Sequence, residues 1–123
     1  MYSAQVLDHF EHPRNAGEVP DADASVQVEN PACGDILRLS AKVSDGHITD
    51  IRFRAKGCVP SMACASLLTE MVKGRSLAEA RQLRREQLVE AAGSLPPASM
   101  HASPLAMDAL AALLRALATD FHG

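Results

Sequence analysis

The chain has 123 residues, the length of one ordinary domain, so we expect residues 1–123 to share a single core. Hydrophobic residues make up 47% and charged residues 22%, a balance that excludes extensive disorder. The net charge is −3 and the basic residues are scattered, which excludes the basic footprint of a nucleic-acid-binding protein. The chain starts without a secretory signal and has no apolar run of about 18 residues, so we expect a cytoplasmic protein that binds no membrane.

The first half of the chain predicts one short helix followed by three strands. Apolar residues recur at helical spacing behind Ser3, which predicts a helix over residues 3–12. Alternation of polar and apolar residues then predicts strands at 25–29, 36–43 and 48–55. The turn at Asp45-Gly46 predicts that the last two strands form an antiparallel hairpin.

The second half of the chain predicts helices. Pro60 suits a first helical turn and Gly74 suits the position just past a helix end, so we expect a helix between them. Ser76 and Glu79 form a capping box for the next short helix. Further helices are expected at 84–92 and 103–118. The sequence therefore predicts an α+β fold, in which a three-stranded antiparallel sheet packs against several helices.

The three cysteines point to metal or sulfur chemistry more than to disulfides, because an odd number of thiols in a reducing compartment argues against a disulfide framework. Cys33 and Cys58 each lie beside a glycine, at opposite ends of the predicted hairpin. Those ends return to the same edge of the sheet, so the two sulfurs can meet there. Cys64 falls on the apolar side of the predicted helix, where core packing is the expected role.

Two further side chains can reach the same edge of the sheet. Asp35 follows Cys33 by two residues, and His101 comes after a double proline at the start of the last helix. Two thiolates, one carboxylate and one imidazole would fill a tetrahedral metal site or the open positions of a two-iron cluster. The residues alone leave two alternatives, namely buried cysteines that only pack, and a Cys58 nucleophile with His101 as its base.

The other histidines have no companion ligands at useful spacing. We therefore assign them to surface or capping roles: His9, His12, His47 and His122.

Several segments, in order along nearly the whole chain, resemble one known family. They are Tyr2-Ser3, 8–17 (DHFEHPRNAG), 30–35 (NPACGD), 57–58 (GC), 61–63 (SMA), 65–70 (ASLLTE) and 72–77 (VKGRSL). Any one of these would be a weak signal, whereas all of them in order and at the right intervals are specific. The chain resembles the U-type iron-sulfur cluster assembly scaffolds, which are related to the N-terminal domain of the nitrogen-fixation scaffold.

The resemblance implies a scaffold rather than an enzyme. A labile [2Fe-2S] cluster would be assembled from iron and from sulfur supplied by a cysteine desulfurase, and would then pass to acceptor apo-proteins. The family's ligand positions correspond here to Cys33, Asp35, Cys58 and His101. A third family cysteine, directly after the histidine, corresponds to Ala102.

The departures from the family pattern shape the remaining expectations. Without a thiol at position 102, a zinc-binding structural or regulatory relative and a persulfide carrier on Cys58 stay open as alternatives. Residues 95–99 (LPPAS) resemble a leucine-proline-proline-valine-lysine segment that recruits a heat-shock chaperone in one branch of the family. Because the lysine is missing, we expect such recruitment to be weak or absent.

We expect a monomer or a weak dimer.

Overall fold

The computed structural model describes residues 2–31, 34–93, 95 and 102–120. Its elements follow the predicted order, with one sheet and helices before and after it, and this confirms the α+β class. They are α1 (Ala4–Glu11), β1 (Ala24–Asn30), β2 (Asp35–Ser44), β3 (His47–Lys56), α2 (Val59–Val72), α3 (Leu77–Arg81), α4 (Arg85–Ala91) and α5 (Ala102–Asp120). Among the described residues, no helix has the length and hydropathy needed to cross a bilayer.

The sheet is antiparallel, with strand order β1-β2-β3, as predicted. The β2–β3 hairpin turns at Asp45 and Gly46, whose φ angles of 52° and 75° are those of a tight turn matched to the twist of the strands. At the other end of the hairpin, Ile36 pairs with Lys56. This register places the start of β2 beside the segment that connects β3 to α2.

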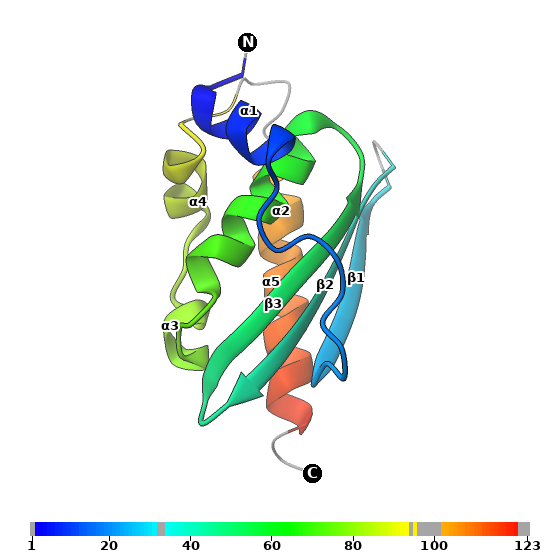
Figure 1. The fold of residues 1–123 in the computed structure, drawn as a ribbon, viewed down its shortest axis with the longest axis vertical. Helices are drawn as coiled ribbons and strands as arrows, with labels where there is room; N and C mark the ends of the chain where they lie inside the picture. Colours follow the sequence, from blue (N-terminus) through cyan, green and yellow to red (C-terminus); the bar gives the residue numbers. More distant parts are fainter. Residues whose placement is uncertain (1, 32–33, 94, 96–101, 121–123) are drawn as a thin grey trace.

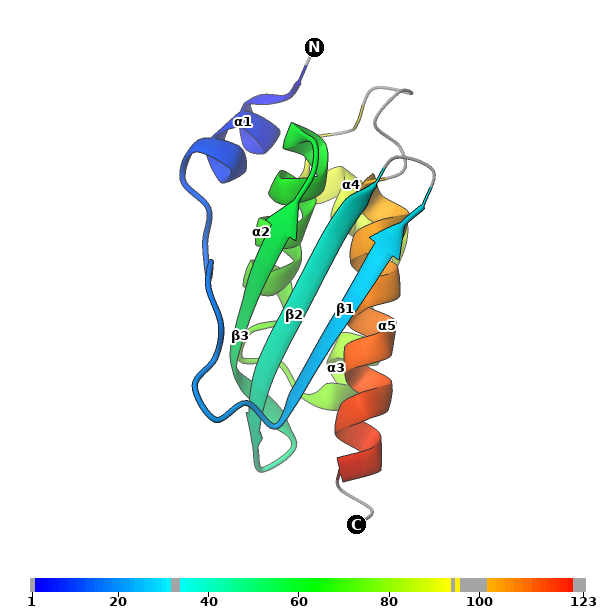
Figure 2. The same ribbon diagram turned by 90° about the vertical axis from the view of Figure 1, so that its right-hand side faces the viewer.

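The segment that follows α1 lies along the outer edge of β3, where Figure 2 shows it as a blue trace beside that strand. Gly17 donates a backbone hydrogen bond to the Phe53 carbonyl (2.8 Å), and Phe53 donates one to the Asn15 carbonyl (2.9 Å). No local pattern in the sequence indicates this pairing. The segment satisfies backbone groups of β3 that an open edge strand would expose.

The helices α2 to α5 gather on one face of the sheet, as Figures 1 and 2 show. Helix α5 packs against β1 and β2, and α2 packs against β3. The core between these layers consists of aliphatic side chains that are almost completely buried, among them Leu37, Leu39, Ile51, Leu68, Leu113 and Leu117. Their burial is the main favourable contribution to folding.

Helix α2 is buried on more sides than its predicted apolar face. It begins one residue before Pro60, with Cys58 in the N-cap position, and Gly74 follows its end as predicted. Ser61, Ser66 and Thr69 are buried together with its apolar residues. Helix α1 packs against α2, and its His9 contacts Ser66. Ser61 is instead buried against Asp35 of β2.

The predicted helix caps are present. The Ser3 hydroxyl accepts a hydrogen bond from the Val6 amide (3.0 Å), and so begins α1. Ser76 and Glu79 exchange the two hydrogen bonds of a capping box, each 3.0 Å long. Such caps satisfy amide groups that have no partner inside a helix, and each typically contributes about 1 kcal/mol.

The predicted surface or capping role of His9 is wrong. Its side chain lies between α1 and α2, and the residue is only 5% exposed. Nδ1 of His9 is 2.8 Å from the Ser66 hydroxyl, which also accepts the Arg14 backbone N–H at 2.8 Å. Burial lowers the pKa of His9, with a further contribution from the positive charge of Arg14, while Glu70 and Asp8 act in the opposite direction.

The lowered pKa of His9 predicts that the protein becomes less stable as the pH falls below about 6.5, the ordinary value for histidine. In that range the unfolded chain takes up the proton first, so the stability present above pH 6.5 is lost as the pH falls through the lower folded pKa. Urea unfolding between pH 7.5 and 5 should show a smaller loss in His9→Gln than in the wild type. The exposed His47, changed to glutamine, is the matched control, and an equal pH slope for wild type and His9→Gln would refute the prediction.

Candidate functional site

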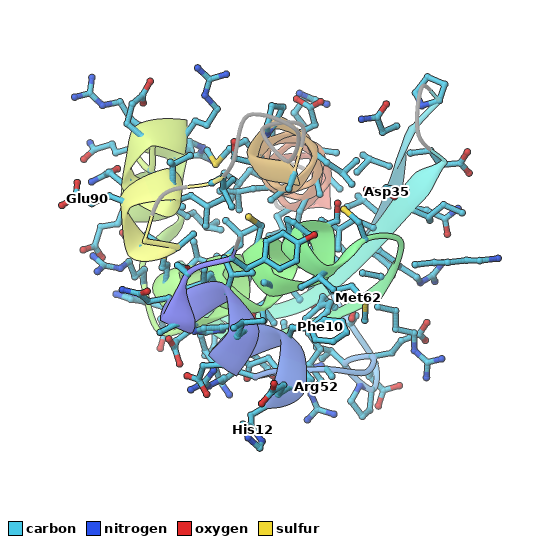
Figure 3. The ribbon with its side chains drawn as sticks, turned by 90° about the horizontal axis from the view of Figure 1, so that it is seen from above. Phe10, His12, Asp35, Arg52, Met62 and Glu90 are labelled. Carbon is cyan, nitrogen blue, oxygen red and sulfur yellow. The ribbon has the colours of Figure 1, made fainter. Side chains whose placement is uncertain are left out.

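The chemically distinctive residues lie at the end of the sheet opposite the β2–β3 turn. Asp35 is the first residue of β2, and Cys58 is the N-cap residue of α2. Because Ile36 pairs with Lys56, the residues on either side of that pair are neighbours in space. Figure 3 views the molecule from this end, with Asp35 labelled.

Asp35 and Cys58 are in direct contact. Sγ of Cys58 lies 3.4 Å from Oδ2 of Asp35, in a geometry in which the thiol donates to the carboxylate. Asp35 is 5% exposed, whereas Cys58 is half-buried. We refer to these two residues as the Asp35–Cys58 pair. A thiol and a carboxylate thus lie side by side near the surface.

Ser61 completes this contact. Its hydroxyl donates to Oδ2 of Asp35 over 2.5 Å and lies 3.2 Å from Sγ of Cys58. Ser61 is a residue of this contact that the sequence did not predict. The available signal was its spacing, because a residue three positions after the N-cap lies on the same side of the first helical turn. Its closeness to Asp35, 26 positions earlier in the chain, arises only from the fold.

Gly57 lets the backbone approach the carboxylate of Asp35. A Cβ atom at Gly57 would lie 2.5 Å from Oδ1 of Asp35 and 2.6 Å from its Cγ, closer than side-chain atoms normally approach. The glycine before Cys58 is therefore required by packing. One oxygen of Asp35 abuts the Gly57 backbone, and the other faces Ser61 and Cys58.

The remaining predicted ligands, Cys33 and His101, lie outside the described residues. Where the structure describes the chain, no group of three or more His, Cys, Asp or Glu side chains is arranged to hold a metal ion. Ala102, at the position that the resemblance assigns to a third cysteine, is the first residue of α5 and is 1% exposed. Of residues 95–99, Leu95 alone is described, and its side chain is buried.

Cys64 is a packing residue, which confirms its predicted role. It is fully buried in the core on α2. Burial raises the pKa of its thiol to about 12, with a smaller contribution from Cys58. A thiol with this pKa remains protonated at neutral pH, so it is a poor metal ligand and a poor nucleophile. The two described cysteines are only six residues apart, but Cys64 is buried in the core whereas Cys58 is half-buried and contacts Asp35.

The structure is thus an α+β protein with a thiol and a carboxylate in contact at one end of its sheet. The family model described as "NifU-like N terminal domain" matches residues 1–119. The chain belongs to this family, as its resemblance to U-type scaffolds predicts.

Two relatives support this assignment, and a solved structure shares the fold. An iron-sulfur cluster assembly scaffold protein IscU from Archaeoglobus fulgidus is 47% identical over 110 residues, which cover 89% of this chain and 72% of the relative. The IscU scaffold of Escherichia coli K12 is 44% identical over 117 residues, which cover 92% of this chain and 91% of the relative. The structure of a nitrogen-fixing NifU-like protein (N-terminal) from Brucella abortus has the same fold, with a TM-score of 0.76. The match covers 95% of this chain and 94% of the Brucella chain, at 20% sequence identity.

Proposed function

We propose that this protein is a scaffold on which an iron-sulfur cluster is assembled and from which the cluster passes to acceptor proteins. The observation that carries the proposal is the 44% identity to the Escherichia coli IscU scaffold over about nine tenths of both chains. Relatives of this similarity are named as scaffold proteins, not as enzymes. The function is therefore to hold and transfer a cluster, without turnover of a substrate.

The proposed cargo is a [2Fe-2S] cluster held by Cys33, Asp35, Cys58 and His101, with sulfur supplied by a cysteine desulfurase. The contact between Asp35 and Cys58 supports this set, because it brings two of the four side chains within 3.4 Å. Thiolates bind iron strongly, whereas carboxylate oxygen is a poorer match for a cluster iron. A mixed set of this kind favours release to an acceptor over permanent storage.

The proposed location is a reducing compartment, the cytoplasm. Neither Cys58 nor Cys64 forms a disulfide. Thiols that must accept iron have to stay reduced, and this is the normal state of cytoplasmic cysteines.

Anaerobic reconstitution with iron, sulfide and a thiol tests the scaffold function. We expect the wild type to develop the visible absorption of sulfide-bridged iron, with iron and sulfide bound in equal amounts. Cys58→Ala should lose this absorption because a primary ligand is gone. The matched control is Cys64→Ala, which should keep it because that thiol is buried in the core.

The same experiment separates scaffolding from its alternatives when Ala102→Cys is included. A colourless wild type that retains zinc, and that gains the chromophore only as Ala102→Cys, would refute cluster assembly by the natural chain. A chromophore that survives in Cys58→Ala would refute the proposed ligand set. Transfer of the cluster from the wild type to an apo-ferredoxin then tests the second half of the function.

A further inference from the structure

The side chain of Asp35 is fixed on two sides within the site. Its Oδ1 and Cγ abut the backbone of Gly57, where a Cβ atom would come within 2.5 Å of Oδ1. Its Oδ2 accepts the hydroxyl of Ser61 at 2.5 Å. The carboxylate therefore has little freedom to rotate, and the oxygen that faces Cys58 is the one bound to Ser61.

The Ser61 hydroxyl is well placed to fix this orientation. Ser61 is 5% exposed and lies in the first turn of α2, so the helix determines where its hydroxyl points. The bond joins a hydroxyl donor to a carboxylate acceptor, and such charge-assisted bonds are the stronger class of hydrogen bond. Bulk water has little access to compete for it.

The hydrogen bond from Ser61 leaves the site able to bind metal. A carboxylate oxygen has two lone pairs, so Oδ2 can keep the Ser61 bond and still bind an ion. Sγ of Cys58 lies 3.2 Å from the Ser61 hydroxyl and 3.4 Å from Oδ2. When a metal ion binds, Cys58 gives up its thiol proton to solvent, and the Ser61–Asp35 bond needs no change.

We propose that Ser61 is a positioning residue, whose hydroxyl holds Oδ2 of Asp35 beside Sγ of Cys58 so that the two atoms bind a metal ion together. The proposal deepens the scaffold function, since the natural ion would be a cluster iron. It also holds for any divalent ion that takes one sulfur and one oxygen ligand. Partners that orient a ligand in this way typically contribute about 10- to 100-fold to metal affinity.

Titration of the full-length, metal-free chain with Co²⁺ under anaerobic conditions tests the proposal. The charge-transfer absorption from thiolate to Co²⁺ reports metal binding at cysteine directly. It does not require cluster assembly. We expect Ser61→Ala to weaken binding by about 10- to 100-fold. Ser61→Thr keeps the hydroxyl and should recover most of the affinity. Thermal unfolding of each variant shows whether it is folded.

A double-mutant cycle with Asp35→Ala separates positioning from a general structural effect. If Ser61 acts through Asp35, Ser61→Ala should weaken Co²⁺ binding in the wild type and have no effect in the Asp35→Ala background. An equal loss in both backgrounds would overturn the proposal. So would unchanged affinity in Ser61→Ala, or a wild type that shows no thiolate–cobalt band.

The two proposals fail in different ways. A wild type that binds Co²⁺ with the expected Ser61 dependence, but forms no sulfide-bridged chromophore, would refute scaffolding and leave the role of Ser61 intact. A Ser61→Ala variant that assembles and transfers a cluster as well as the wild type, and binds Co²⁺ with the same affinity, would refute the role of Ser61 and leave scaffolding intact.

Discussion

Replacing Gly57 with alanine should weaken metal binding at the Asp35–Cys58 pair and lower the free energy of unfolding by about 1–3 kcal/mol. The added methyl group would lie 2.5 Å from Oδ1 and 2.6 Å from Cγ of Asp35. Because those atoms belong to a buried side chain, the carboxylate has to move. Its contacts with Ser61 and Cys58 would then be lost together.

The measurement is Co²⁺ affinity from the thiolate absorption band, combined with urea unfolding of the metal-free protein. We expect a loss of about 10- to 100-fold in affinity, as for the removal of a residue that orients a ligand. Gly74→Ala is the matched control. Gly74 has a φ of +85° with nothing within 4 Å of an added Cβ, so alanine there strains the backbone without touching the site. Gly74→Ala should lower the free energy of unfolding by about 1–2 kcal/mol and leave Co²⁺ affinity unchanged.

Equal Co²⁺ affinity in Gly57→Ala and the wild type would contradict the prediction. It would mean that the Asp35 carboxylate can adopt a second position from which it still binds the metal ion. A loss of affinity as large in Gly74→Ala would contradict it as well, because general destabilisation would then account for the effect.

The elements of this fold were predictable because their signals are local. The turn at Asp45 and Gly46 needs positive φ at both positions, and the structure has it. Ser76 and Glu79 lie three residues apart and form the box that their spacing predicts. In each case the residues that determine the element are neighbours in sequence, so no knowledge of the tertiary structure was needed.

The missed features all depend on contacts between distant segments. His9 is buried because α1 packs on α2, and its partner Ser66 lies 57 positions away. The role of Ser61 depends on Asp35, which belongs to another element. Periodicity within α2 predicts one buried face and cannot show that a second helix covers the other side.

The approach of Asp35 to Cys58 was predictable for a different reason. An antiparallel hairpin returns its two ends to one edge, and both residues flank such ends. The hairpin turn is thus responsible for the site, although it lies at the far end of the sheet. The register of β2 against β3 decides which residues meet, and a slip of one residue would turn the carboxylate to the other face.

Replacing Leu68 with alanine should lower the free energy of unfolding by about 2–5 kcal/mol, because it leaves a cavity in the core around which the neighbouring side chains relax only in part. Leu68 is completely buried on α2. Leu7, which is 41% exposed on α1, is the matched control, since the same substitution there leaves no cavity. Urea unfolding of both variants measures the difference, and a cost for Leu7→Ala equal to that for Leu68→Ala would contradict the prediction.

The same variant separates stability from site geometry. Leu68 follows Cys58 by ten residues along α2, a distance of about 15 Å at the rise of an α-helix. We therefore expect Leu68→Ala, under conditions where it is folded, to bind Co²⁺ with wild-type affinity. Gly57→Ala should show the reverse pattern, with a smaller loss of stability and a large loss of affinity. Parallel losses in both variants would mean that the core of α2 and the Asp35–Cys58 pair respond as one unit, and that metal affinity reports the stability of the whole helix.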